Sequence, residues 1–315
     1  MWLRRPSSVG EAGVSRVRLR IPLHLSGFWC PNYGRSPPGT GSVGAGITLG
    51  PPLTADLMRG APPLLNGRPV PKEGVNAVLR AVPGASNFSI NASAPADLGE
   101  GLGVSAALLI ALSASALVSR GVKPSHELLI NACRVAHNIE VTGRTGLGDV
   151  IAEFVGGGLV VRVRPGPPGV GEAYPIRVRD SLKVVVVRLG TMLTPSMLKQ
   201  YAGKIAVCGR LALSRFLRNP TLEEFLTQSR WFSNETGMFV ACSGEARRML
   251  DRLVRRGCVL GYFVKKSLLA VFAGSECADE VADLLGSACA SNKLACAGRV
   301  KVLGPVAERA TVLST

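Results

Sequence analysis

Apolar and polar residues alternate from Val17 to Leu25, and this period of two predicts a β-strand with one buried face. Pro22 lies inside the run. Because proline has no backbone N–H to donate, we expect an edge or an end of the strand there. Residues 1–15 show no period, so we expect a disordered tail or an overextended start. Shorter runs predict further strands at 47–49, 87–93 and 156–162.

Two apolar stretches predict helices. Val104 to Val118 contains only three serines in 15 residues, which indicates a helix buried inside the protein. A membrane span needs about 20 apolar residues, so this stretch is too short to be one. A second helix is expected from Ser125 to Val141, because its apolar residues share one face: Leu128, Leu129, Ala132, Val135, Ala136 and Ile139.

The other face of this second helix carries Arg134, His137 and Glu140 at successive spacings of three. On an isolated helix such a stripe is usually solvated. After it, the second half of the chain predicts helices at 221–233, 243–256 and 276–288, and strands at 183–189, 261–264, 267–273 and 299–303. At 315 residues, the chain fits two domains better than one.

A glycine-rich loop opens into the first helix, from Pro95 to Leu108. Its three glycines allow backbone N–H groups to approach an anion closely, and the helix start adds positive charge, so we expect a phosphate site. A Walker A loop is excluded because no Lys-Ser or Lys-Thr pair follows Gly103. A dinucleotide fingerprint is formally present, but a second helix follows at Pro124 where a strand is required.

Two more glycine-rich segments flank this loop in the sequence. Residues 31–46 are dense in Gly, Pro and Ser and predict a loop, either with room for a ligand or as a plain connector. Residues 142–149 form a tight glycine loop that ends in Asp149, followed by Gly156-Gly157-Gly158 and a strand. An aspartate at this place either caps the loop or acts in chemistry.

These segments together resemble the GHMP kinase superfamily and, within it, the archaeal pantoate kinases. The resemblance rests on G-S-x-G-A-G at 41–46, G-L-G-x-S-A-A at 101–107, T-G-L-G-D at 145–149 and G-G-L-V-x-R at 157–162. It covers roughly residues 19 to 275 and implies an α+β fold. Residues 16–180 would form a ribosomal protein S5 domain 2-like domain, and residues 181–315 a ferredoxin-like α/β domain, with ligands in the cleft between them.

The resemblance implies roles for individual residues. Asp149 would accept the proton of the substrate hydroxyl, whereas Ser105 and Glu140 would hold Mg²⁺ and complete the catalytic set. The substrate would contact Ser42, His137, Arg162 and Thr194. The phosphates of ATP would lie on Gly99, Gly101, Leu102, Gly103, Val104, Ser105 and Ala106.

Two departures from the superfamily pattern bear on these roles. Val104 stands where the loop usually has its first serine, and Ser105 keeps the second. The C-terminal glycine-rich motif, here Lys265 to Gly274, lacks the usual G-x-G, which weakens any inference about phosphate contacts from that half.

The net charge of +16 raises nucleic-acid binding as the competing class of function. Aromatic residues make up only 5% of the chain and basic residues are scattered in ones and twos, so a nucleic-acid partner is not expected. The eight cysteines show no C-x2-C pair, and no zinc site is expected. We expect buried thiols in a cytoplasmic chain, and leave open a Cys289–Cys296 bridge and a homodimer.

The resemblance thus implies ATP-dependent phosphorylation of pantoate to 4-phosphopantoate for coenzyme A synthesis. The alternative enzyme is another GHMP kinase acting on a small hydroxy acid or an isoprenoid precursor, such as homoserine or mevalonate.

Overall fold

The computed structural model describes residues 17–144, 146–189, 194–242 and 244–314, with the backbone alone at 194–200 and 241. The tail expected at 1–15 lies outside these residues. The first half forms a mostly antiparallel sheet around two long strands, β1 (Val17–Asn32) and β2 (Gly41–Arg59). Around them lie β3 (Leu64–Leu65), β4 (Arg68–Pro69), β5 (Phe88–Ser93), β6 (Leu159–Arg164) and β7 (Glu172–Ile176).

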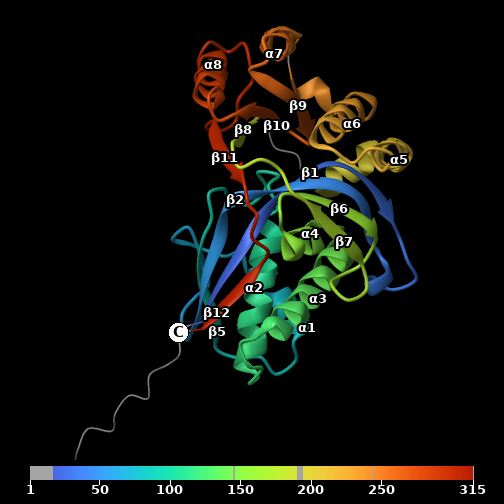
Figure 1. Cartoon of the computed structure of the whole chain (residues 1–315). Coiled ribbons are helices and arrows are strands. Elements are labelled where there is room, and N and C mark those ends of the chain that lie inside the picture. Colours follow the sequence, from blue (N-terminus) through green and yellow to red (C-terminus); the bar gives the residue numbers. More distant parts are fainter. Residues whose placement is uncertain (1–16, 145, 190–193, 243, 315) are drawn as a thin grey trace, which may run out of the picture.

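Helices cover one face of this first sheet (Figure 1). Of these, α2 and α4 pack on β1 and β2, and α3 packs on α1 and α2. The two helices expected from the apolar stretches are confirmed, because α2 and α3 begin within one residue of the predicted positions. The bounds are α1 (Lys72–Ala81), α2 (Val104–Ser119), α3 (His126–Gly143) and α4 (Asp149–Val155).

The second half folds as a four-stranded antiparallel sheet in the order β11-β8-β10-β9, with helices packed against it. A first strand, helices, two strands, a helix and a last strand follow one another, which is the ferredoxin-like arrangement. The elements are β8 (Leu182–Arg188), α5 (Thr194–Phe216), α6 (Leu222–Glu235), α7 (Gly244–Arg255), β9 (Val259–Lys265), β10 (Leu268–Gly274), α8 (Ala278–Ala290) and β11 (Lys301–Pro305).

The end of the chain returns to the first sheet. β11 pairs with β8 through residues 301–303 and with β2 through residues 304–305, so it joins the two sheets. The last strand, β12 (Thr311–Ser314), pairs with β1. The predicted division at residues 180 and 181 stays a prediction, and the pairing of β12 places residues 311–314 with the first sheet.

Pro22 lies where β1 changes its pairing. β12 pairs with β1 only as far as Arg20, and the register between β1 and β2 shifts between Ile21 and Leu23. Since an edge strand tolerates a missing N–H, the prediction of a strand edge at Pro22 is confirmed.

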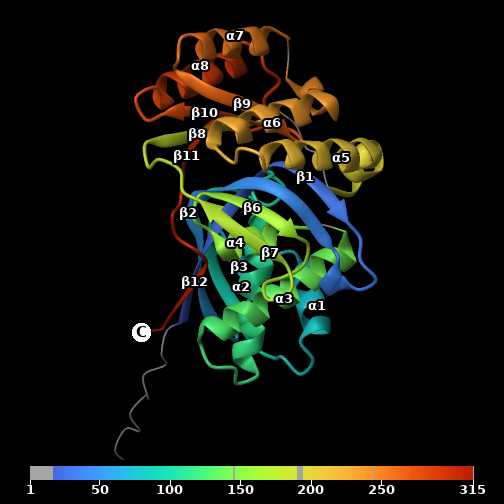
Figure 2. The same cartoon turned by 45° about the vertical axis from the view of Figure 1, so that its right-hand side comes forward.

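Aromatic side chains join the two halves across β1. Phe28 of β1 contacts Phe216 of α5 and Phe225 of α6, and Trp29 contacts Phe232 of α6, with ring centroids 4.9 to 6.0 Å apart. Figure 2 shows α5 and α6 lying across β1. Because these rings are buried, the second half is held firmly against β1.

The loop expected over residues 31–46 is wrong for residues 31–32, which belong to β1, and for residues 41–46, which belong to β2. Strand β2 pairs with β1 on one side and with β6 on the other over this stretch. The glycines are explained by crowding: a Cβ at Gly44 would overlap the backbone of Phe28, and one at Gly46 would overlap the His24 ring. Only residues 33–40 connect the two strands.

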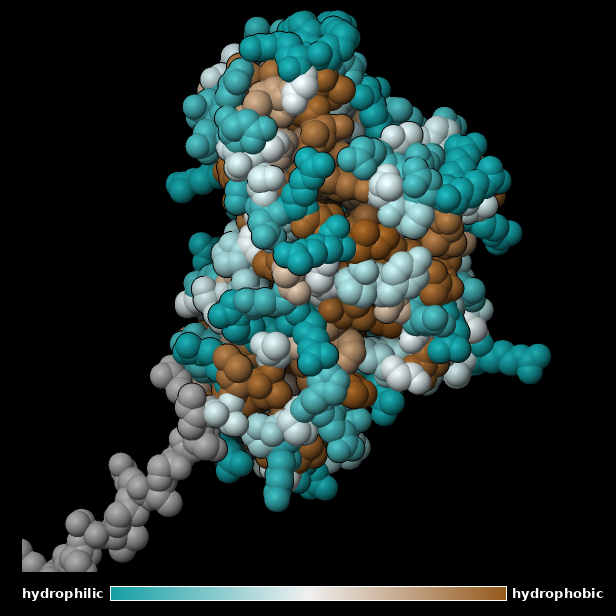
Figure 3. Space-filling view, viewed as in Figure 1, coloured by the Kyte–Doolittle hydropathy of each residue, from teal (hydrophilic) through white to brown (hydrophobic). Residues whose placement is uncertain are grey.

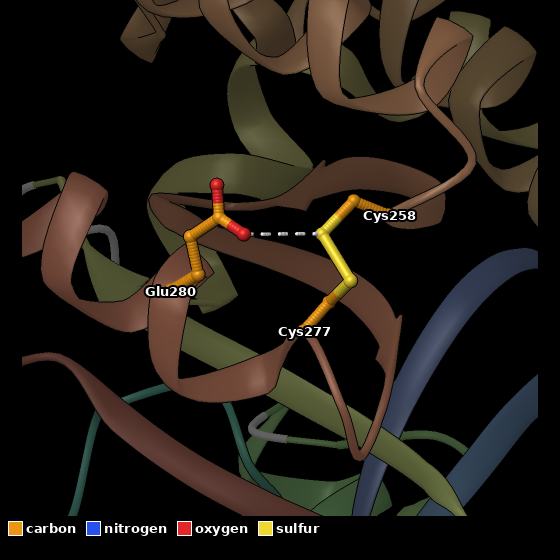
Figure 4. Close-up of side chains that lie close together, drawn as sticks. All are labelled: Cys258, Cys277 and Glu280. Carbon is orange, nitrogen blue, oxygen red and sulfur yellow. Dashed lines mark hydrogen bonds between the residues drawn. A yellow bond between two sulfur atoms is a disulfide. The ribbon is translucent and has the colours of Figure 1, made fainter.

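Two disulfides tie the second half together, Cys258–Cys277 and Cys289–Cys296. The sequence left the second of these open and gave no signal for the first. Glu280 lies 3.8 Å from the Cys258 sulfur, and these three residues are the only group of three or more His, Cys, Asp or Glu side chains among the described residues whose ligand atoms lie close enough to share a metal ion (Figure 4). Since both sulfurs are in a disulfide, they do not offer thiolate ligands.

Hydrophilic residues lie along the edges of both halves, and hydrophobic surface lies toward the middle of the face in Figure 3. In the described part of the chain, no helix combines the length and the apolar character needed to cross a membrane.

Candidate active site

The glycine-rich loop between β5 and α2 is held by contacts on one side and faces open space on the other. Gly103 directly precedes α2 with a φ of 80°, and a Cβ there would overlap the carboxyl of Glu153. The His24 N–H donates to the Leu102 carbonyl at 3.1 Å, which ties the loop to β1. A Cβ at Gly99 would meet nothing within 4 Å. The loop therefore presents its other side, with the N-terminus of α2, to open space.

A cavity of about 560 Å³ adjoins this loop. Ser105, in the first turn of α2, lies at the cavity with Leu108 and Leu112 of the same helix, and α3 contributes Asn138 and Thr142. The lining is mostly apolar with a few polar groups. This is the usual character of a pocket for a small organic ligand.

Asp149 opens α4 at the end of the second glycine loop, and its side chain is 24% exposed. The His24 Nδ1 lies 2.6 Å from its Oδ1, Ser26 Oγ lies at 3.5 Å, and the Lys265 ammonium is 3.9 Å away. Burial alone would raise the pKa of Asp149. Lys265, the hydrogen bond from His24 and the charge of Arg162 outweigh it, holding that pKa well below its usual range. Asp149 is therefore a fixed carboxylate.

The His24 ring is fully buried, and burial lowers its pKa to about 4 despite the opposing hydrogen bond to Asp149. At neutral pH the ring is uncharged, so Nδ1–H donates to the carboxylate. A neutral donor holds Asp149 in place without protonating it.

Two further acids lie near Asp149. Glu140 is 3% exposed and its carboxylate lies against Gly146, so α3 and the second glycine loop meet there. Burial and the charge of Asp149 raise the pKa of Glu140 to about 8. Glu153 lies one turn after Asp149 and is fully buried, and the same two causes raise its pKa well above the usual value. Three carboxyl groups this close together favour either a bound cation or protonation of one of them.

Arg162 and Ser42 come together through strand pairing. Gly44 of β2 pairs with Arg162 of β6, which places the guanidinium beside residue 42, and a Cβ at Gly148 would overlap Ser42 Oγ and lie 2.7 Å from Arg162 NH1. Arg162 is 1% exposed and donates one bond, from NH1 to the Gly148 carbonyl at 3.0 Å. Its Nε and NH2 have no partner among the described residues. Two parallel donors on one edge of a buried guanidinium fit a carboxylate.

His137 and Thr194 are the other two residues expected to contact the substrate. The His137 Nε2 lies 3.0 Å from the Thr40 carbonyl and 3.2 Å from that of Pro37, so the ring fixes the connection that leads into β2. Thr194 begins α5, and its side chain lies outside the described residues. The roles of both toward a substrate stay predictions.

Comparison with known proteins supports the assignment to a kinase family. Pantoate kinase from Thermococcus kodakarensis is 30% identical over 251 residues, which are 76% of this chain and 82% of the relative. Pantoate kinase from Methanocaldococcus jannaschii is 31% identical over 225 residues, 69% and 79% of the two chains. The chain belongs to the pantoate kinase family. No protein-family model matches it.

Solved structures confirm the GHMP kinase fold for this member of the pantoate kinase family. A phosphotransferase related to the CoA biosynthesis pathway has a TM-score of 0.76 at 26% identity and covers 95% of this chain and 98% of its own. Mevalonate diphosphate decarboxylase from Enterococcus faecalis, at 13% identity, has a TM-score of 0.63, with 96% and 99% of the two chains covered. The α+β prediction is confirmed.

The sequence missed four residues near Asp149 in this pantoate kinase family site, namely His24, Ser26, Glu153 and Lys265. His24 appeared only as a polar position in an alternating strand, and Lys265 only as part of a motif without its glycines. Lys265 is 5% exposed, and its ammonium donates to the Gly101 carbonyl at 3.1 Å. The burial of Lys265 becomes visible only in the structure, because the sequence at the end of β9 gives no sign that this lysine is buried.

Proposed function

We propose that this protein transfers the γ-phosphoryl group of ATP to pantoate and so makes 4-phosphopantoate for coenzyme A synthesis. The proposal rests on one observation. The carboxylate of Asp149, held by neutral His24, lies close to the guanidinium of Arg162, whose Nε and NH2 have no partner among the described residues. A substrate with a hydroxyl and a carboxylate needs a base and a cation side by side. The similarity to pantoate kinases supports this substrate.

Each residue of the site has its own role in this reaction. Asp149 orients the attacking hydroxyl and takes its proton as the bond to phosphorus forms. Arg162 binds the substrate carboxylate through Nε and NH2, with Ser42 beside it, and His137 supports the strand that carries Ser42. The N–H groups of residues 99–106 bind the phosphates of ATP. The cavity beside Ser105 accepts the adenine ring.

The residues present also fit Mg²⁺. A hydroxyl and one carboxylate are enough, because this ion keeps several of its waters. Ser105 and Glu140 would hold it, and the ion would supply charge neutralisation for the triphosphate. Burial and, after it, the charge of Asp149 raise the pKa of Glu140, and a cation bound there would favour its charged form. A structural neighbour in complex with AMPPCP and magnesium, at 12% identity, shares the fold.

A coupled assay of ADP release tests the function. We expect pantoate to be phosphorylated far faster than homoserine, mevalonate or phosphomevalonate, because the relatives that this chain matches over most of its length are pantoate kinases. Equal or faster turnover of mevalonate or homoserine would transfer the proposal to another GHMP kinase reaction. No turnover of any alcohol, with salt-sensitive binding to DNA or RNA, would favour nucleic-acid binding.

Removing a proposed magnesium ligand should change the metal dependence. In Ser105→Ala and Glu140→Gln, we expect the Mg²⁺ concentration for half-maximal activity to rise by roughly 10-fold or more, because an oxygen ligand is lost. The measurement is initial rate against Mg²⁺ at saturating ATP and pantoate. Glu127→Gln, an exposed glutamate in the first turn of the same helix α3, is the control. An unchanged Mg²⁺ curve in both variants would remove these ligands.

The protein is proposed to act in the cytoplasm, where its nucleotide substrate is abundant, and a homodimer stays open.

A further inference from the structure

Lys265 lies at the end of β9, where the chain turns into β10 above the phosphate loop. Its ammonium donates to the carbonyl of Gly101 at 3.1 Å and lies 3.9 Å from the carboxylate of Asp149. Leu268, at the start of β10, is the nearest neighbour that a Cβ at Gly101 would meet, at 3.6 Å. The turn between β9 and β10 therefore rests on the phosphate loop, and Lys265 spans from that loop to Asp149.

The ammonium is buried but incompletely satisfied. Lys265 is 5% exposed, and burial, opposed by the charge of Asp149, lowers its pKa. An ammonium has three N–H donors. Among the described residues, only the Gly101 carbonyl accepts one at hydrogen-bond distance, because Asp149 at 3.9 Å is an ion-pair partner beyond that distance. Two donors therefore remain for a ligand between these groups.

The position coincides with the path of the reaction. The γ-phosphoryl group leaves a triphosphate held by the loop at 99–106 and arrives at a hydroxyl held by Asp149. One end of this path is in contact with Lys265 through Gly101 and the other end lies 3.9 Å away at Asp149. Negative charge on the moving group is spread over its three equatorial oxygens, and a fixed cation in a partly dry site stabilises it.

We propose that Lys265 is a catalytic residue that donates to the transferred phosphoryl group, so that the second half of the chain supplies a side-chain cation to the reaction. This inference rests on the proposed kinase function. It also gives a role to the Lys265 to Gly274 segment, which lacks the G-x-G pattern that would let backbone N–H groups approach a phosphate closely.

The step balances without a change at Lys265. The pantoate hydroxyl oxygen forms a bond to the γ-phosphorus while the bond from that phosphorus to the β,γ-bridging oxygen breaks. The electron pair of the broken bond stays on ADP, and the hydroxyl proton passes to Asp149. Lys265 remains an ammonium throughout and only neutralises charge.

The test compares Lys265→Met and Lys265→Gln with the wild-type protein. Methionine keeps the length of the side chain without charge, and glutamine keeps a donor toward Gly101. We expect kcat for pantoate phosphorylation to fall roughly 10- to 100-fold in both, since one preorganised donor to the transition state is lost. The KM for pantoate and the calorimetric affinity for ADP, which has no γ-phosphoryl group, should stay within about threefold. Lys265→Arg should recover part of kcat.

Lys293→Met is the control, because this exposed lysine of the same half pairs with Glu245 on the surface. A kcat within about threefold of wild type in Lys265→Gln would overturn the proposal, because the charge would then be dispensable. An equal loss of ADP affinity and kcat in all three variants would make Lys265 a support of the loop and would overturn it too. Absence of pantoate kinase activity in the wild-type protein would instead refute the function itself.

Discussion

Replacing Asp149 with asparagine should lower kcat for pantoate phosphorylation by roughly 100- to 10,000-fold, the usual loss for a general base. Asparagine keeps the shape of the side chain, and its amide oxygen still accepts the bond from His24 Nδ1. What disappears is the negative charge and the ability to take the hydroxyl proton. Steady-state kinetics at saturating ATP and pantoate measures the effect.

The affinity for ATP should hardly change, because among the described residues Asp149 contacts His24, Ser26 and Lys265 and not the phosphate loop itself. Asp251→Asn is the matched control: this aspartate also pairs with a cation and a neutral donor, Arg230 and Tyr262, but it lies in the second half away from the site. If Asp149→Asn stayed within a few-fold of wild type, the aspartate would be a loop cap, the alternative that its glycine-rich surroundings also permit.

Short sequence motifs predicted the features of this site that depend only on residues close by in the chain. The start of α2 after Gly103 and the start of α3 near Ser125 follow from a glycine turn and a serine cap, since Ser125 Oγ accepts the Leu128 N–H at 3.2 Å. Both signals lie within a few residues of the feature they determine. The GHMP kinase fold was reached through such short segments.

Contacts between distant residues could not be predicted in the same way. His24 and Asp149 are separated by 125 positions, and Lys265 and Gly101 by 164. Each pair depends on strand register and on how the two halves meet, and a one-residue change of register would turn a side chain to the opposite face. Gly44 and Gly46 show the same limit, because the crowding by Phe28 and His24 that requires them comes from a neighbouring strand.

Removing the guanidinium of Arg162 should lower kcat/KM for pantoate roughly 30- to 1000-fold. Arg162 is 1% exposed, and its Nε and NH2 find no partner among the described residues, while NH1 is held by the Gly148 carbonyl. A substrate carboxylate that accepts both free donors gains a charge-assisted pair in a site with little water. Losing one costs on the order of 2 to 4 kcal/mol.

The loss in Arg162→Ala should appear mainly as a higher KM for pantoate, with the KM for ATP nearly unchanged. Arg162→Lys should also be impaired, because a lysine cannot form two parallel bonds from a planar group. Ser42→Ala and His137→Ala should give milder losses. Arg164→Ala is the matched control, since this arginine is exposed at the end of the same strand β6. A raised KM for ATP in Arg162→Ala would place Arg162 with the nucleotide, and the partner of the pantoate carboxylate would then be another residue.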